Sequence, residues 1–349
     1  MPLLLPAVLI ALLTGCADPG PEAAFNTYLT RLERPLETAA PVLETAAVPR
    51  APRPAKLRIP IPPGRLDALD FLALRGCDLQ VTVGKRNSSL GRLAPPSQEL
   101  LLELEFLRLA PACIDYLARE GNNGLAQELT AAMESKRQAL PARIYNATLA
   151  TQEFRSLWKT PNGLGDYPQA TSSAPVAALD AINALSAGWL AGDYAANNRD
   201  VEILLSEVAM GDAGALMMAL NLQQAGLTAA NAMLRSRGDR GALCQGPLIP
   251  AEVDIFKNVV QKFFIGGIQP WSASLGQRSH TLLPPVRSLE AQLAAVLPTR
   301  YRDWQSRRDA LLNTAAGAPR RHVEAVKRLL VGCRQPPSDS PLQTQGSEH

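Results

Sequence analysis

The chain has 349 residues, of which 46% are hydrophobic and 19% charged, and this composition is typical of a folded globular protein with one large domain or two. Its 35 basic and 32 acidic side chains give a net charge of +3 and are spread along the chain, which disfavours a nucleic-acid-binding role. After the N-terminal segment no run of 18 apolar residues occurs, so we expect no second membrane segment.

The first segment is an apolar leader that ends in a cysteine. Residues 3–13 are apolar or proline, which is long enough for an export signal and too short for a spanning helix of roughly 20 residues. The letters LTGC at 13–16 match a bacterial lipobox. We therefore predict a lipoprotein signal peptide over 1–15 and lipid attachment at Cys16; the alternative is an ordinary secretory leader. Ala17 favours the periplasmic face of the outer membrane.

Residues 16–64 follow as a lipid-attached N-terminus. The stretch AAFNTYLTRL predicts a short helix, and residues 35–64 then contain eight prolines. Because proline has no amide donor, this segment predicts an extended strap. The strap is either a spacer from the membrane or a segment that lies on the folded domain.

Apolar residues at helical spacing come next. Leu69, Leu72, Gly76, Leu79 and Val83 predict one helix, in which Gly76 allows close contact with another helix.

Two stretches carry a family resemblance. LDFLALRGCDLQVTVGKRNSSLGR at 69–92 and LEFLRLAPACI at 104–114 resemble an uncharacterised family of Gram-negative envelope lipoproteins described as a domain of unknown function. The words GCDLQ and RNSSLG carry most of the match, which extends more loosely over most of the mature chain. The resemblance implies an exported lipoprotein without assigned activity, and it implies neither a fold nor a mechanism.

The stretch GKRNSSLGR within this region is a candidate binding loop for an anion or a partner. Its donors are Lys85, Arg86, Asn87, Ser88, Ser89 and Arg92. A loop rich in amides, hydroxyls and guanidinium groups suits a phosphate, a carboxylate or a lipid headgroup. The favoured structural interpretation is that Asn87 and Ser88 turn the chain between two helices while the basic groups are solvated or pair with acids on neighbouring helices.

The rest of the chain predicts helices almost throughout. Ser97 is the expected N-cap of a buried helix over QELLLELEFLRLA, which Pro111 bends or restarts. We expect loops at 160–174 and 266–285, and a disordered tail at 334–349. Further helices are expected near 124–139, 142–158, 175–191, 198–210, 213–235, 251–265, 286–296, 299–314 and 319–331.

Four cysteines remain besides Cys16, which suits two disulfides in an oxidising compartment. We predict the pairs Cys77–Cys113 and Cys244–Cys333, because each would link adjoining helical segments. Four buried thiols are the alternative.

Catalytic patterns are weak. Ser156 and Lys159 have the Ser-x-x-Lys spacing of penicillin-recognising enzymes, but the companion motifs are absent. The three histidines, His280, His322 and His349, are too scattered for a metal site or a triad. We expect His322 on the exposed side of a basic helix.

Basic helices with Tyr301 and Trp304 end the chain. They could face anionic lipid headgroups, but interleaved acids such as Asp303 and Glu324 favour ordinary salt-bridged helix faces.

Together these patterns predict an all-α, irregular multi-helix globular domain with two disulfides and an N-terminal proline-rich extended strap. The helical domain covers 65–333, and a boundary near 160–174 divides it into two sub-bundles.

Three classes of function remain open. The leading prediction is a non-enzymatic, lipid-anchored envelope protein that presents its helical domain to an envelope protein or cell-wall partner, with no cofactor and no nucleic acid. One alternative is a carrier of an apolar or lipid ligand between helices, and the other is a hydrolase or transferase with an unidentified site. A large lined cavity favours the carrier, convergent polar groups favour the enzyme, and an exposed apolar patch favours partner binding.

Overall fold

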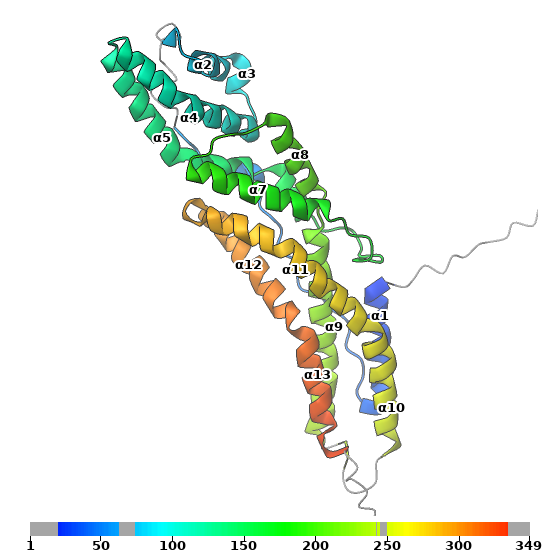
Figure 1. Ribbon diagram of the computed structural model, residues 1–349. Coiled ribbons are helices and arrows are strands. Elements are labelled where there is room, and N and C mark those ends of the chain that lie inside the picture. Colours follow the sequence, from blue (N-terminus) through cyan, green and yellow to red (C-terminus); the bar gives the residue numbers. More distant parts are fainter. Residues whose placement is uncertain (1–19, 63–73, 242, 245–249, 334–349) are drawn as a thin grey trace, which may run out of the picture.

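The computed structural model describes residues 20–62, 74–241, 243–244 and 250–333, and within these ranges every regular element is helical, as predicted. The helices are stacked into an elongated rod (Figure 1). The predicted leader, Cys16 and the tail at 334–349 lie outside the described residues. The main elements are α1 (Gly20–Leu36), α2 (Leu79–Asn87), α3 (Ser89–Arg92), α4 (Pro96–Arg119), α5 (Asn123–Ala147), α6 (Gln152–Leu157), α7 (Ala174–Ala191), α8 (Asn198–Ala209), α9 (Ala213–Asp239), α10 (Ala251–Val259), the π-helix η4 (Val260–Ile268), α11 (Gln269–Gln292), α12 (Thr299–Ala316) and α13 (Ala318–Leu329).

Hydrophobic clusters of the described residues follow one another along the rod. The upper cluster contains α2, the second half of α4 and the first half of α5. The central cluster contains the other halves of α4 and α5 with α6, α7, α8, α11, α12 and the start of α9. The lower cluster contains α1, the rest of α9, α10, η4 and α13. Because α4, α5 and α9 each contribute to two clusters, these long helices connect the parts of the rod.

Both predicted disulfides are confirmed. Cys77 and Cys113 have Cα atoms 5.3 Å apart and join the segment before α2 to α4. Cys244 and Cys333 have Cα atoms 5.2 Å apart and join the segment after α9 to the short 3-10 helix η6 (Val331–Cys333) that follows α13. Each bond therefore closes one end of the rod.

The loop expected at 266–285 is wrong, because α10, η4 and α11 form one uninterrupted helical stretch. Pro284 and Pro285 lie inside α11, where each removes a backbone hydrogen bond and costs about 3 kcal/mol in a helix interior. The apolar face of α11, including Leu275, Leu282 and Leu289, is buried against the central cluster. Tertiary packing therefore overrides the local breaker signal.

Other prolines are likewise tolerated inside helices. Pro111 lies within α4, and Pro141 lies within α5, which continues to Ala147 instead of breaking near 140. The expected cap at Ser97 is also wrong: α4 begins one residue earlier, and the Ser97 hydroxyl donates to Glu202 Oε1 on α8 at 2.7 Å.

The single helix expected across 69–83 is interrupted. Leu69 and Leu72 are outside the described residues, and Gly76 has φ of +96° in a turn before α2. A Cβ atom at Gly76 would lie closer than 3.0 Å to the Tyr116 ring. The close contact expected at this glycine is present, in a left-handed turn that side-chain-bearing residues rarely adopt.

His322 is fully buried rather than exposed as expected. Its Nε2 lies 2.8 Å from the Tyr28 hydroxyl, and its Nδ1 lies 2.7 Å from Asn231 Oδ1. Burial lowers the pKa of His322 to about 4. Both hydrogen-bonding partners come from other helices, α1 and α9, which a pattern along α13 does not reveal.

Two helical stretches of the described residues, Ala174–Ala191 and Asn198–Asp239, are long and apolar enough to cross a membrane by length and composition alone. Core helices of soluble proteins satisfy the same criterion, and both stretches contribute buried residues to the hydrophobic clusters.

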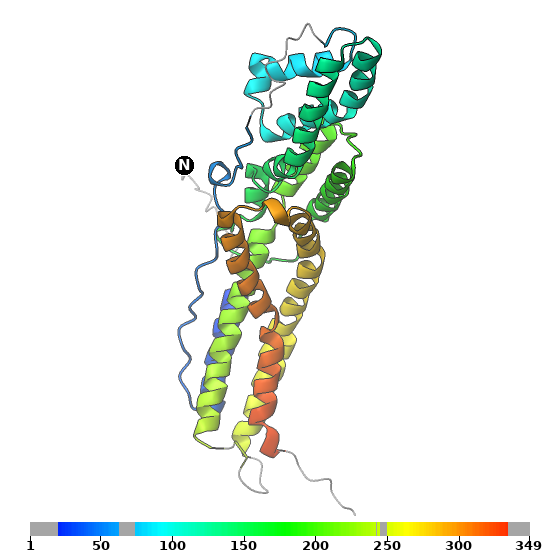
Figure 2. The same ribbon diagram turned by 90° about the vertical axis from the view of Figure 1, so that its left-hand side faces the viewer.

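The proline-rich strap, residues 38–62, lies on the helical domain. It runs along one side of the rod from the lower end of α1 toward the α4–α5 pair (Figure 2). Its backbone is extended apart from one short turn at Pro54–Lys56. The strap therefore connects α1 of the lower cluster to the upper half of the molecule.

Candidate functional site

Side chains of the helical domain hold the strap by hydrogen bonds to its backbone. Asn221 Nδ2 on α9 donates to Ala46 O at 2.7 Å, and Trp304 Nε1 on α12 donates to Pro49 O at 3.3 Å. Farther along, the Asn146 side chain on α5 makes both hydrogen bonds of a paired contact with Ile59, each at 2.8 Å. Because prolines leave few amides for regular structure, these side chains supply the strap's partners.

A groove of about 910 Å³ lies beneath the strap, and we call it the wide compartment. The start of α1, the segment 160–165 and α9 form its other walls. Its volume lies in the range of about 300–1,000 Å³ that is usual for small-molecule sites. Polar and apolar side chains alternate on its walls, and the largest apolar ones are Leu43, Val48, Leu164, Met218 and Leu222. The wide compartment is therefore suited to the hydrocarbon part of a ligand.

A second compartment of about 400 Å³ shares Arg50 and Thr160 with the wide one, and we call it the cationic compartment. Its walls are the strap around Arg50 and the α6 region with Arg155 and Lys159. Among the described residues, these three cations line it and no carboxylate does. In the wide compartment, by contrast, Glu22 also lines the wall.

The local fold of α6 turns its cations outward. Thr151 caps the helix, with its Oγ1 accepting from Phe154 N at 3.2 Å. Phe154 and Leu157 are buried in the central cluster, which leaves Arg155 on the accessible side of this short helix. The start of α9 packs directly on the following backbone, since a Cβ at Gly214 would lie closer than 3.0 Å to Lys159 O.

Within the part of the chain that the structure describes, the three cations of the compartment have no ion-pair partner. Across the described residues, no side-chain hydrogen bond or salt bridge is made by Arg50, Arg155 or Lys159. Trp158 also lines the compartment and is 3% exposed. Its Nε1 is buried without a hydrogen-bond partner, as are seven other side-chain polar atoms of the described residues.

The Trp158 ring is held from behind by the domain core. The Arg308 guanidinium lies 4.8 Å from its ring centroid, and the Trp304 ring meets it edge to face at 5.3 Å. Arg308 is itself neutralised by Glu290 in a buried pair, with Nη1 to Oε1 at 2.6 Å. The Trp158 ring is thus packed against the core through Arg308 and Trp304.

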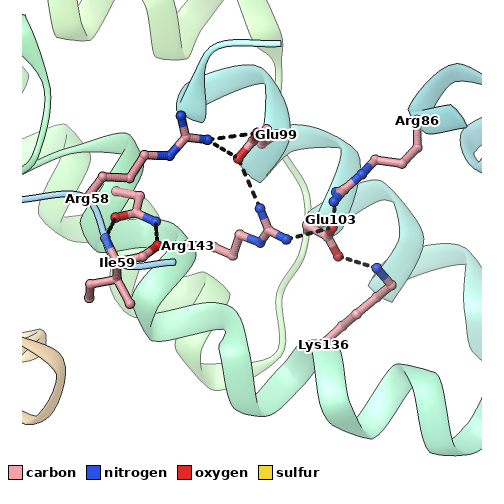
Figure 3. Close-up of polar contacts among 8 residues, drawn as sticks. Arg58, Ile59, Arg86, Glu99, Glu103, Lys136 and Arg143 are labelled. Carbon is pink, nitrogen blue, oxygen red and sulfur yellow. Dashed lines mark hydrogen bonds and ion pairs between the residues drawn. The ribbon is translucent and has the colours of Figure 1, made fainter. Parts of the chain in front are cut away.

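A network of paired charges lies higher on the rod, where Glu103 and Glu99 of α4 face cations from other segments (Figure 3). Glu103 is 3% exposed; it pairs with Arg86 of α2 and with Lys136 of α5 at 2.8 Å. Burial alone would raise the pKa of Glu103, but the charges of Lys136 and Arg86 outweigh it and lower the pKa below its ordinary value. Glu99 pairs with Arg58 of the strap at 2.9 Å.

A comparison with profiles of known protein families places the chain in one of them. The profile of a family described as a protein of unknown function (DUF3080) matches residues 25–337. The chain belongs to this family. No curated protein and no solved structure matches this DUF3080 protein significantly.

In this DUF3080 protein, the residues of the candidate loop either support the local fold or face solvent. Ser88 Oγ accepts from Gly91 N at 3.0 Å and caps α3, while Asn87 ends α2 and Ser89 begins α3. Arg86 turns inward to Glu103, as Figure 3 shows, and Lys85 pairs with Glu105 at 3.5 Å. Arg92 is exposed. Two of the loop's basic groups, Lys85 and Arg86, thus pair with acids on α4.

Ser156 and Lys159 both line the cationic compartment, but no hydrogen bond between their side chains is present among the described contacts. The described contacts therefore do not include the serine–lysine hydrogen bond by which such a pair activates a nucleophile. Sequence reasoning missed Arg50 and Arg155. A cation among the strap's prolines was the available signal for Arg50, since such a side chain must lie at the surface.

No group of three or more His, Cys, Asp or Glu residues that could hold a metal ion is found in the part of the chain that the structure describes.

Proposed function

We propose that this DUF3080 protein is a lipid-anchored protein of the cell envelope that binds an amphiphilic, lipid-like ligand in the groove beneath its strap. The observation that carries the proposal is that a wide compartment of about 910 Å³, with several large apolar side chains on its walls, adjoins a cationic compartment. A hydrocarbon chain fits the first, and a polar head fits the second. This is the carrier alternative of the sequence analysis, which the groove favours over the other classes.

The predicted anchor supports the same role. Gly20, at the start of α1, lines the wide compartment. Cys16 is four residues earlier in the chain, a separation that spans at most about 14 Å. Lipid attachment at Cys16 would therefore keep the mouth of the groove close to a membrane surface, where an amphiphile enters over a short distance.

The anchor is tested by changing Cys16→Ser. We expect the wild-type chain to incorporate labelled palmitate and to sediment with membranes, while the variant does neither. Equal labelling and membrane retention of both chains would contradict the lipid anchor.

Ligand binding is tested separately on the full-length Cys16→Ser chain, which cannot carry its own acyl group in the groove. We expect a fluorescent fatty acyl probe to bind this chain and to bind at least tenfold more weakly after Met218→Glu, which places a charge in the apolar compartment. The matched control is Met210→Glu, at a position 78% exposed and outside the groove lining. Equal loss in both variants, or no binding at all, would contradict the proposal.

A second candidate function is presentation of the rod to a protein partner, the leading prediction from the sequence. Val81, Leu90 and Leu93 favour it, because these large apolar side chains are 59%, 83% and 86% exposed in and just after α2 and α3. Exposed apolar residues gathered in one region are typical of protein–protein contacts.

Partner presentation is tested by Leu90→Asp/Leu93→Asp in cells. We expect the double variant to lose envelope crosslinks that the wild type and Met210→Asp both form. Identical crosslinks in all three chains would contradict a docking role for this region.

A further inference from the structure

We propose that the cationic compartment binds the phosphate group of the amphiphile, with Arg50, Arg155 and Lys159 as its ligands. This inference rests on the proposed binding function of the groove and names the chemical class of the ligand's head. The phosphate could belong to a phospholipid or be free in solution, so the test separates these two sources.

The charges of the compartment lack the compensation that several other cations of the rod have. Arg143 and Lys136 meet carboxylates in the network of Figure 3, and Arg278 meets Asp212. In contrast, Arg50, Arg155 and Lys159 line one compartment with no carboxylate among its described lining residues. Like charges gathered in one recess repel one another, and a bound anion removes that cost.

The donors of the three cations suit the same ligand. Arg50 and Arg155 each present several N–H groups in a planar fork, and Lys159 presents an ammonium group. Several charged donors match the several acceptor oxygens of a phosphate better than a single neutral carbonyl.

The position of Arg50 fixes the orientation of the ligand. Arg50 borders both compartments, and its neighbour Pro49 is held by the hydrogen bond from Trp304. Glu22 is on the wall of the wide compartment and disfavours an anionic head there. The phosphate therefore lies in the cationic compartment, and the acyl chain passes Arg50 into the wide compartment toward Met218 and Leu222.

The test compares two probes on the full-length Cys16→Ser chain by calorimetry: lysophosphatidic acid and a monoacylglycerol with the same acyl chain. The variant Arg155→Ala/Lys159→Ala removes two cations from the compartment. The matched control Arg92→Ala/Arg199→Ala removes two exposed cations that no described contact pairs. Thermal unfolding of each variant monitors the fold.

We expect lysophosphatidic acid to bind the unchanged groove at least tenfold more tightly than the monoacylglycerol. The compartment variant should remove this preference, while the control keeps it and monoacylglycerol binding stays equal in all chains. Equal affinity of the two probes for the unchanged groove would overturn phosphate recognition and leave the groove's apolar binding standing. Absence of binding by either probe would instead overturn the proposed function itself.

Inorganic phosphate is the third probe. We expect phosphate alone to bind weakly and the compartment variant to abolish this binding, which supports the site. Far tighter binding of lysophosphatidic acid supports a lipid as the source of the phosphate group. Phosphate binding as tight as that of lysophosphatidic acid would overturn the lipid source. Loss of the preference in the control as well would overturn the assignment to these residues, because it would show a general effect of net charge.

Discussion

Trp304 on α12 donates its indole N–H to the backbone carbonyl of Pro49, 255 residues earlier in the chain, at 3.3 Å. The contact joins the C-terminal helices to the strap at the residue before Arg50. The ring of Trp304 also packs edge to face against Trp158 at 5.3 Å, so one side chain supports both the strap and the buried wall of the cationic compartment. The shape of the groove therefore depends on a side chain that does not line it.

Trp304→Phe should loosen the strap while keeping an aromatic ring in the core. The loss of one buried hydrogen bond predicts destabilisation of about 0.5–1.5 kcal/mol, with an added cost from the smaller ring. Cleavage of the strap after Arg50 by trypsin should become faster in limited proteolysis. Unchanged cleavage there would show that Trp304 does not hold the strap.

Gly214→Ala should distort the groove from the α9 side. The added Cβ would lie closer than 3.0 Å to Lys159 O, a backbone atom that cannot rotate away, and such overpacking costs about 1–3 kcal/mol. The matched control is Gly276→Ala on α11, where a Cβ meets nothing within 4 Å and the change should be neutral or stabilising. Thermal unfolding of the two variants checks the prediction, and equal melting temperatures would refute it.

Cys77→Ser/Cys113→Ser and Cys244→Ser/Cys333→Ser should each destabilise the rod, by about 2–5 kcal/mol. In the chain-entropy model the second pair contributes slightly more, because its loop spans 89 residues against 36. Denaturant unfolding of the oxidised wild type and the two variants measures the differences. If reducing agent shifts the wild-type midpoint no more than that of the variants, the bonds do not stabilise the protein in solution.

The sequence predicts those features of the rod that depend on neighbours along the chain. Apolar spacing locates most helices, and cysteines that flank helical segments indicate the correct pairs. The stretch 266–285 escapes prediction because its prolines carry a strong local signal, whereas the burial of Leu275 and Leu282 that overrides it depends on α7 and α9.

The candidate site escapes prediction for a related reason. Arg50 comes from the strap and Arg155 and Lys159 from the α6 region, so the compartment exists only after the strap has folded onto the domain. His322 is similar, since its position on α13 resembles a solvated basic face until Tyr28 of α1 packs against it. Sites assembled from distant segments leave little periodic signal in any one of them.

Glu290→Gln should be among the most destabilising single changes. Glu290 accepts hydrogen bonds from Tyr301 Oη at 2.6 Å and from both terminal nitrogens of Arg308, and Glu290 and Arg308 are 2% and 1% exposed. Neutralising the carboxylate leaves the buried guanidinium with Asp309 as its one charged partner among the described residues, which predicts a loss of about 3–5 kcal/mol. Denaturant unfolding measures it.

A double-mutant cycle with Arg308→Met as the second single change tests whether Glu290 and Arg308 interact. Replacing both members, as Glu290→Gln/Arg308→Met, should recover much of the loss, because the uncompensated charge is gone. A double variant that loses the full sum of the two single changes would show that the pair does not interact as described.

The buried His322 should make stability fall in mild acid. Its folded-state pKa of about 4 is below the ordinary value of 6.5, so the unfolded chain binds the extra proton first. The contribution of neutral His322 is therefore complete above pH 6.5 and is lost progressively as the pH falls toward 4. The shift corresponds to a loss on the order of 3 kcal/mol across this window. Glu103, whose pKa is lowered, adds its own loss only as the pH falls below about 4.5.

His322→Gln should be less stable than wild type at pH 7.5, and its unfolding free energy should change less between pH 7 and pH 5. Parallel pH profiles for the two chains, measured by denaturant unfolding, would refute the assignment.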